Sequence, residues 1–193
     1  MRTFLSYPIA LLSLLALAGC VSVPAPAYQP GIGNTRLLLD GGKTGISLGK
    51  FDAAPGVENE GLGIRGSTLS AGGDGTFSTY VRDAVRAELD AAARYEPGSP
   101  LSLACTLTGN SIDSGGIGSS KGEASVSARF VLSREGVVRY DRTLTARHQW
   151  DSSFIGAIAI PAAIDNYPAA VQKLVERLFS DPDFERAQDA TSG

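Results

Sequence analysis

Three side chains that could carry out hydrolysis follow one another along this chain. Ser120 is the central serine of residues 118–122 (GSSKG), a Gly-x-Ser-x-Gly spacing, and Asp141 and the only histidine, His148, come after it. In such a site the histidine accepts the serine proton and the aspartate orients the histidine. The spacing requires a strand before the serine and a helix after it, whereas here a glycine-serine turn leads into a strand pattern. A hydrolase that uses these three residues is therefore the alternative hypothesis, not the leading one.

A second spacing with chemical meaning covers residues 61–66 (GLGIRG), which fit Gly-x-Gly-x-x-Gly. Dinucleotide binding needs these glycines directly after a strand and at the start of a helix, because the helix N-terminus binds the pyrophosphate. Pro55 and Gly56 precede the motif, and residues 67–75 show no helical pattern. We therefore expect a glycine-rich loop over residues 52–75 and no nucleotide cofactor.

Metal ligands and basic surfaces are scarce in this sequence. One histidine and one cysteine apart from Cys20 cannot build a zinc site, and no calcium-loop spacing occurs, so we expect no metal and no cofactor. Cys105 lies on the apolar side of a strand pattern, which predicts a buried and unreactive thiol. The formal net charge of −3 argues against a nucleic-acid partner, which would need a basic surface.

Cys20 stands in a different context. Residues 4–17 are almost wholly apolar, follow Arg2 and lead into residues 17–20 (LAGC). An apolar run of this length is typical of a signal peptide and is short for a membrane span. The arrangement resembles the lipobox of bacterial lipoproteins, which implies removal of residues 1–19 and attachment of lipid to the Cys20 thiol. The alternative is an ordinary signal peptide followed by a chance cysteine.

The lipobox resemblance also implies a location. Lipoproteins retained in the inner membrane carry aspartate after the acylated cysteine, whereas Val21 and Ser22 follow it here. The outer membrane is therefore implied, with the domain facing the periplasm and two or more acyl chains holding it stably. Residues 20–34 include three prolines and are predicted to form an extended tether.

Residues 35–185 are predicted to form one α+β domain, followed by a disordered tail at 186–193. Period-two patterns predict strands, and apolar residues at helical spacing predict two helices, the first capped by Thr76 and with Glu88 on its solvent side. One-sided helices and a sheet with one apolar face predict a two-layer sandwich: a mostly antiparallel sheet of about four or five strands with two helices on one face. The predicted strands are 35–39, 45–51, 101–108, 124–132 and 138–150, and the predicted helices are 77–93 and 166–180.

The stretch from Phe154 to Ile164 contains no charged or strongly polar residue. Two interpretations stay open: a buried connection beneath the second helix, or an exposed apolar surface that contacts lipid or a partner protein. Large apolar side chains would anchor such a contact. The candidate contact residues are Trp150, Phe154, Ile155, Ile158 and Ile160.

The order of these parts resembles the YajG-like and transport-auxiliary outer-membrane lipoproteins. The resemblance covers about Thr35 to Phe184 and rests on layout: a lipobox, a strand pair, a helix, three strands, a C-terminal helix and the closing residues 181–184 (DPDF). It implies a location and a fold more than an activity. The leading hypothesis is a lipid-anchored, non-enzymatic protein that binds lipid or a partner, as an accessory to an envelope transport or assembly complex. A purely structural envelope protein is the third hypothesis.

Overall fold

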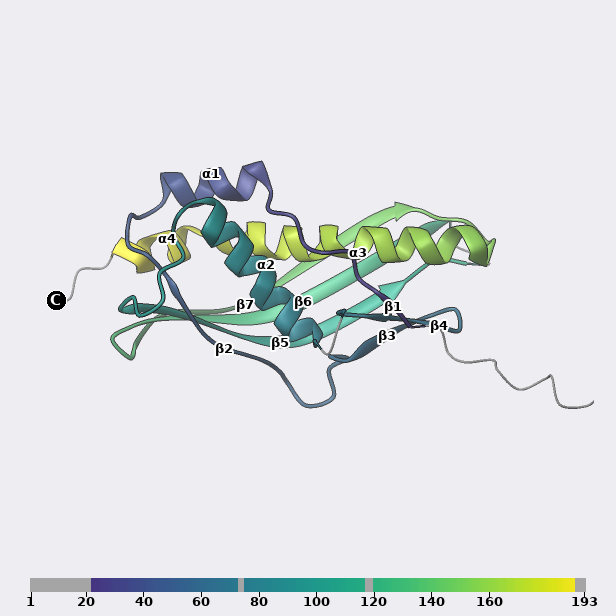
Figure 1. Cartoon of the computed structure of the whole chain (residues 1–193), viewed down its shortest axis with the longest axis horizontal. Helices are drawn as coiled ribbons and strands as arrows, with labels where there is room; N and C mark the ends of the chain where they lie inside the picture. Colours follow the sequence, from purple (N-terminus) through teal and green to yellow (C-terminus); the bar gives the residue numbers. More distant parts are fainter. Residues whose placement is uncertain (1–21, 73–74, 117–119, 190–193) are drawn as a thin grey trace, which may run out of the picture.

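A computed structural model describes residues 22–72, 75–116 and 120–189 of the chain. Within these residues the fold is α+β, with four helices, a mixed four-stranded sheet and a mixed three-stranded sheet (Figure 1). In chain order the elements are β1 (Ser22–Pro24), α1 (Ile32–Asp40), β2 (Ser47–Ala53), β3 (Gly61–Ile64), β4 (Ser67–Ser70), α2 (Phe77–Ala91), β5 (Leu101–Asp113), β6 (Lys121–Arg134), β7 (Val137–Asp151), α3 (Gly156–Phe179) and α4 (Pro182–Asp189).

The main sheet has the strand order β2-β5-β6-β7. β5, β6 and β7 pair antiparallel along most of their length, and β2 joins the sheet parallel to β5. The three strands predicted from alternating residues at 101–108, 124–132 and 138–150 are confirmed, and each is longer than predicted. Because β2 is parallel to its neighbour, the sheet is mixed.

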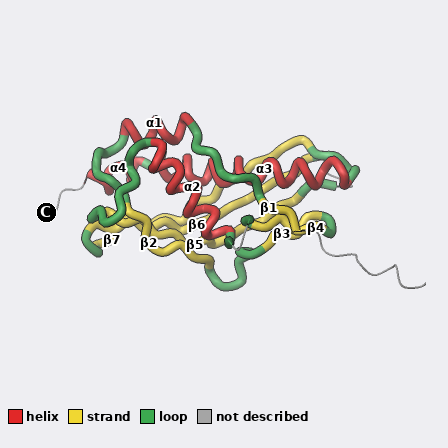
Figure 2. The backbone as a smooth tube through the Cα atoms, in the orientation of Figure 1, coloured by secondary structure: helices red, strands yellow, loops and turns green. Residues whose placement is uncertain are grey.

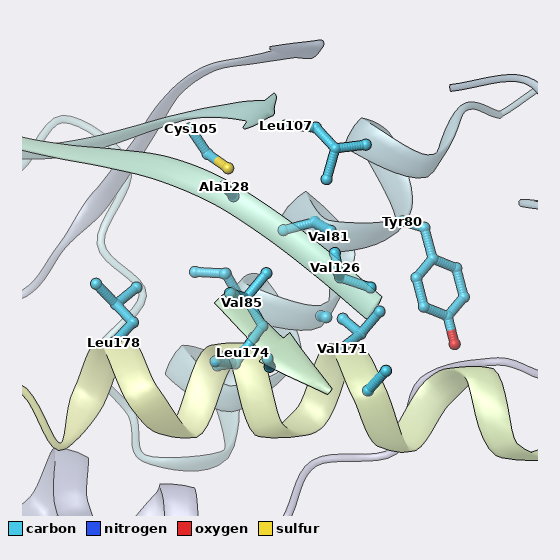
Figure 3. Close-up of a cluster of buried hydrophobic side chains, with 14 of the residues drawn as sticks. Tyr80, Val81, Val85, Cys105, Leu107, Val126, Ala128, Val171, Leu174 and Leu178 are labelled. Atoms are coloured by element: carbon cyan, nitrogen blue, oxygen red, sulfur yellow. The ribbon is translucent and has the colours of Figure 1, made fainter. Parts of the chain in front are cut away.

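The core lies between this sheet and the helices. α2 contacts β2 and β5, α3 contacts β6 and β7, and α1 contacts both α2 and α3. Figure 2 shows these helices gathered over the strands. Figure 3 shows where the buried side chains of the two layers meet. They are Val81 and Val85 of α2, Cys105 and Leu107 of β5, Val126 and Ala128 of β6, and Val171, Leu174 and Leu178 of α3.

The first predicted strand, 35–39, is wrong, because these residues belong to helix α1. Asn34 and Leu38, four residues apart, are the buried positions of this helix, whereas Leu39 is exposed. The periodicity of a short apolar run such as residues 37–39 does not distinguish a strand from a buried helix. Contact with α2 and α3 decides the outcome here.

The loop predicted over 52–75 contains a hairpin instead. β3 and β4 pair antiparallel with Ile64 opposite Ser67, so Arg65 and Gly66 form a two-residue turn. Their φ angles of 46° and 83° are both positive, as a type I′ hairpin turn requires. β1 adds to this hairpin parallel to β4 and completes the small sheet. The Gly-x-Gly-x-x-Gly spacing at 61–66 is therefore a hairpin and not the strand-to-helix turn that binds nucleotides.

The second predicted helix begins ten residues earlier than expected. α3 starts at Gly156 and contains Pro161 and Pro168. Proline removes a hydrogen bond from a helix interior and usually marks its start, which is why the sequence pattern placed the start near Pro168. Within the described residues, no helix combines the length and the apolar character needed to cross a membrane.

The predicted tail is partly helical. Its first residues belong to α4, in which Phe184 is fully buried and its ring meets that of Tyr140 edge-on at 5.3 Å. This contact anchors the C-terminal segment to β7. Residues 190–193 lie outside the described residues.

The proline-rich segment predicted as a tether lies against the domain over residues 22–34. Glu88 Oε1 accepts hydrogen bonds from the Tyr28 hydroxyl at 2.6 Å, the Gly31 amide at 2.9 Å and Asn34 Nδ2 at 2.9 Å. We call these four residues the Glu88 cluster. The assignment of Glu88 to the solvent side of α2 is wrong, since this residue is 0% exposed. It follows Ala84 by four residues and so lies on the buried stripe of the helix.

Candidate contact surface at one end of the fold

Three large apolar side chains are exposed where β7 leads into α3. Phe154, Ile155 and Ile158 are 76%, 46% and 56% exposed. Phe154 and Ile155 directly precede α3, with Ile155 as its extended N-cap, and Ile158 lies in the first turn of the helix. We call them the apolar end patch.

The other side of the same turns faces the core. Ala159 and Ala163 are fully buried. Both interpretations of the stretch 154–164 are therefore correct in part, because one side of the helix is core and the other is an exposed apolar surface.

Two of the five candidate contact residues do not belong to this surface. Trp150 is buried over Gly122 of β6, where an added Cβ would lie 2.3 Å from Trp150 Cε2, and its ring stacks on His148 with 6.1 Å between centroids. Ile160 is partly buried and packs against the core. Trp150 and Ile160 thus belong to or pack against the core, and of the five candidates only Phe154, Ile155 and Ile158 are available to a partner.

Arg65, which the sequence analysis missed, ties the β3–β4 hairpin to the apolar end patch. Its Nη1 donates to the Phe154 carbonyl at 2.9 Å, Nη2 donates to the Ser153 carbonyl at 3.2 Å, and Nε donates to the Gly115 carbonyl at 3.1 Å. Planar guanidinium groups suit such multiple contacts. The alternation of Leu62, Ile64 and Leu69 around a two-residue turn was the signal that could have revealed the hairpin and the position of Arg65.

The proposed catalytic triad is not assembled. Asp141 and His148 are seven residues apart on β7, which places their side chains on opposite faces and separates them by roughly 23 Å. Arg129 Nε donates to Asp141 Oδ1 at 2.7 Å, and this hydrogen bond and the guanidinium charge hold the pKa of Asp141 below its usual range. His148 Nε2 instead meets Asn166 Oδ1 of α3 at 2.9 Å. Ser120 lies in a bend directly before β6, as a turn residue would.

The two cysteines have different outcomes. Cys20, the predicted lipidation site, lies outside the described residues. Cys105 is buried on β5, which confirms the predicted burial, and burial raises the pKa of its thiol to about 12. Within the described residues, no group of three or more histidine, cysteine, aspartate and glutamate side chains is placed to hold a metal ion.

A hollow of about 420 Å³ lies at the opposite end, between β7 and α4. Arg142 and Arg186 line it, and both pair with the Asp183 carboxylate, while Arg142 also meets Asp181 at 3.3 Å. The ion pairs of Arg142 with Asp181 and Asp183 therefore join β7 to the start of α4 beside this hollow.

The fold is thus an α+β domain that presents an apolar surface at one end. Among solved structures it is similar to protein XCC0632 from Xanthomonas campestris, of the family DUF330, with a TM-score of 0.59 and 19% identity over 88% of this chain and 98% of that one. A candidate lipoprotein from Caulobacter crescentus CB15 matches 83% of this chain and 99% of its own at 15% identity and a TM-score of 0.45. No family model matches the sequence, and no curated protein matches it significantly. The similarity to the Xanthomonas protein shows a shared fold.

Proposed function

We propose that this protein is a lipid-anchored lipoprotein of the bacterial envelope whose domain acts by binding and not by catalysis. One observation carries the proposal. The lipobox-like residues 17–20 end two positions before Ser22, where the first strand begins. Acyl chains on Cys20 would therefore be joined directly to the folded domain.

The residues after the cysteine support a location, and the layout of the whole chain supports a role. Val21 and Ser22 after the cysteine favour the outer membrane, with the domain in the periplasm. The layout resembles that of the transport-auxiliary lipoproteins, which favours a role as an accessory subunit of an envelope transport or assembly complex. The separation of Asp141 from His148 supports a non-enzymatic role.

The anchor can be tested on the full-length protein produced in a Gram-negative host. Mass spectrometry should find an N-terminal peptide that begins at Cys20 and carries a diacylglyceryl group and an amide-linked acyl chain. The protein should enter the detergent phase and the outer-membrane fraction, and Cys20→Ala should abolish both. Cys105→Ala, the matched control, should abolish neither. An unmodified Cys20, or residues 1–19 still attached, would overturn the proposal.

The hydrolase alternative has its own test. A fluorophosphonate probe reacts with activated serines, and we expect no labelling of this protein. Labelling that disappears in Ser120→Ala and persists in Ser119→Ala would establish the alternative and overturn the non-enzymatic role.

A further inference from the structure

We propose that the apolar end patch rests on the lipid bilayer itself, so that the domain stands end-on with the start of α3 against the headgroups and upper acyl chains. This inference rests on the proposed anchoring at Cys20 and goes beyond it. An anchor alone fixes where the chain is attached but leaves the domain free to adopt any orientation.

The first step is the direction in which the chain leaves β1. Ser22 pairs with Thr68, and β1 runs parallel to β4. β4 begins at the Arg65–Gly66 turn, so the residues before Ser22 leave the small sheet on the side of that turn. The chain therefore departs toward Cys20 at the hairpin end of the molecule.

The second step connects this end to the apolar end patch. Arg65, in the turn itself, donates hydrogen bonds to the carbonyl oxygens of Ser153 and Phe154. Figure 1 shows β1, β3 and β4 toward the same end of the molecule as the start of α3, with α4 at the other end. The exit of the chain and the exposed side chains of Phe154, Ile155 and Ile158 thus share one end.

The third step is the length of chain available. Ser22 is two positions after Cys20, and a fully extended chain spans at most about 7 Å over two positions. β1 and the Glu88 cluster hold the following residues on the domain, so no free spacer lifts it away. With Cys20 acylated, the hairpin end is held at the membrane surface.

The size of the patch favours lipid over protein as its occupant. A stable protein interface buries more than about 1,000 Å² in total, which three side chains cannot supply. A small apolar surface is sufficient against lipid, because the acyl chains on Cys20 already hold the protein at the membrane and the patch needs only to orient the domain. Phe154, Ile155 and Ile158 are suited to that orienting contact.

The test places a fluorophore at Ile158 in the full-length lipidated protein. Ile158→Cys is labelled with an environment-sensitive dye and reconstituted into vesicles of phosphatidylethanolamine and phosphatidylglycerol that contain lipids brominated on the acyl chain. The acylated Cys20 and the buried Cys105 do not compete for the dye. Val138→Cys is the matched control, since it is 55% exposed against 56% for Ile158 and lies near the other end of β7, about 40 Å from Asp151.

We expect a blue-shifted emission at position 158 and quenching at least about threefold stronger than at position 138. Bromine quenches a fluorophore only at short range, and the brominated acyl chains lie in the hydrocarbon core of the bilayer. Equal, weak quenching at both positions in protein that floats with the vesicles would overturn the inference and leave the anchor intact. Protein that fails to float would overturn the anchor as well. A photoreactive residue at Phe154 that crosslinks to a protein in cells, and not to lipid, would show that the surface binds a partner and would also overturn the inference.

Discussion

The Tyr28 hydroxyl donates a 2.6 Å hydrogen bond to Oε1 of Glu88, a carboxylate that α2 carries into the interior with no exposed surface. The Gly31 amide and Asn34 Nδ2 donate to the same oxygen. A buried carboxylate is costly unless it is hydrogen-bonded, and the segment 28–34 supplies three donors to its Oε1. In return Glu88 holds that segment on the domain.

The Glu88 cluster leads to the first prediction. Tyr28→Phe removes one hydrogen bond to a buried charged group and should lower the free energy of unfolding by about 1.5–3 kcal/mol. Urea denaturation measures this loss, and hydrogen exchange should show faster opening of residues 22–34 than of β6. Tyr95→Phe, whose ring packs against Arg86 outside the cluster, is the control and should change stability far less. Equal losses in the two variants would contradict the role assigned to Glu88.

The second prediction concerns alkaline pH. Burial is the main cause that raises the pKa of Tyr28, Tyr80, Tyr140 and Tyr167, that of Tyr80 to about 12. The folded state therefore keeps these protons when an unfolded chain, with tyrosine pKa values near about 10, has released them. Their contribution to stability is complete below about pH 10 and is lost as the pH rises toward the folded-state values.

Denaturant titrations across the alkaline range test this dependence. The free energy of unfolding should fall steadily above about pH 10, with the phenolate absorbance rising as the protein unfolds. Tyr80→Phe should reduce the slope. A free energy of unfolding that stays constant between about pH 9 and 11.5 would contradict the prediction.

The third prediction concerns Arg65. Arg65→Gly keeps a residue that adopts positive φ readily but removes the guanidinium from the carbonyls of Ser153 and Phe154. Amide exchange over residues 152–156 should speed up by about tenfold, equivalent to about 1.4 kcal/mol, while β3 and β4 stay protected. Arg65→Lys should behave similarly, because a single ammonium cannot bridge two loops. Unchanged exchange at 152–156 would show that the guanidinium does not hold this end together.

The fourth prediction uses the end of α2. Ala93 has a φ of 52°, and the amides of Ala93 and Arg94 donate to the carbonyls of Asp90 and Leu89, a Schellman cap with alanine where glycine is favoured. Ala93→Gly should stabilise the protein by about 0.5–1 kcal/mol and raise Tm by about 2 °C. Ala87→Gly, inside the helix, should lower stability by about 1 kcal/mol instead. A destabilised Ala93→Gly variant would contradict this account of the cap.

The sequence predicts the long strands well because their burial repeats every second residue. β5, β6 and β7 show this alternation. The Thr76 cap of α2 is also predicted correctly, since the Thr76 hydroxyl accepts a hydrogen bond from the Thr79 amide at 3.3 Å. α1 could not be predicted, since residues 37–39 are apolar at every position and only packing against α2 and α3 selects a helix. The early start of α3 was not predicted, because Pro161 and Pro168 lie inside the helix and proline usually marks a helix start.

The candidate surface was only partly predictable for a similar reason. Residue type alone picked out Phe154, Ile155 and Ile158, but it could not separate them from Trp150 and Ile160, whose burial depends on Gly122 and the core. Arg65 depends on contacts with residues about 50 and 90 positions away along the chain. Such distant pairings leave no local signature.

The parallel pairing of β1 with β4 has a mechanical consequence. A force drawn along the chain toward residue 20 would pull β1 lengthwise against its neighbour and load the hydrogen bonds of this pair together instead of breaking them one after another. Behind β1, the Tyr28–Glu88 contact would be strained only once the strand had slipped. A force applied through the lipid would therefore have to break the β1–β4 hydrogen bonds together before any residue of the N-terminal segment detached from the domain.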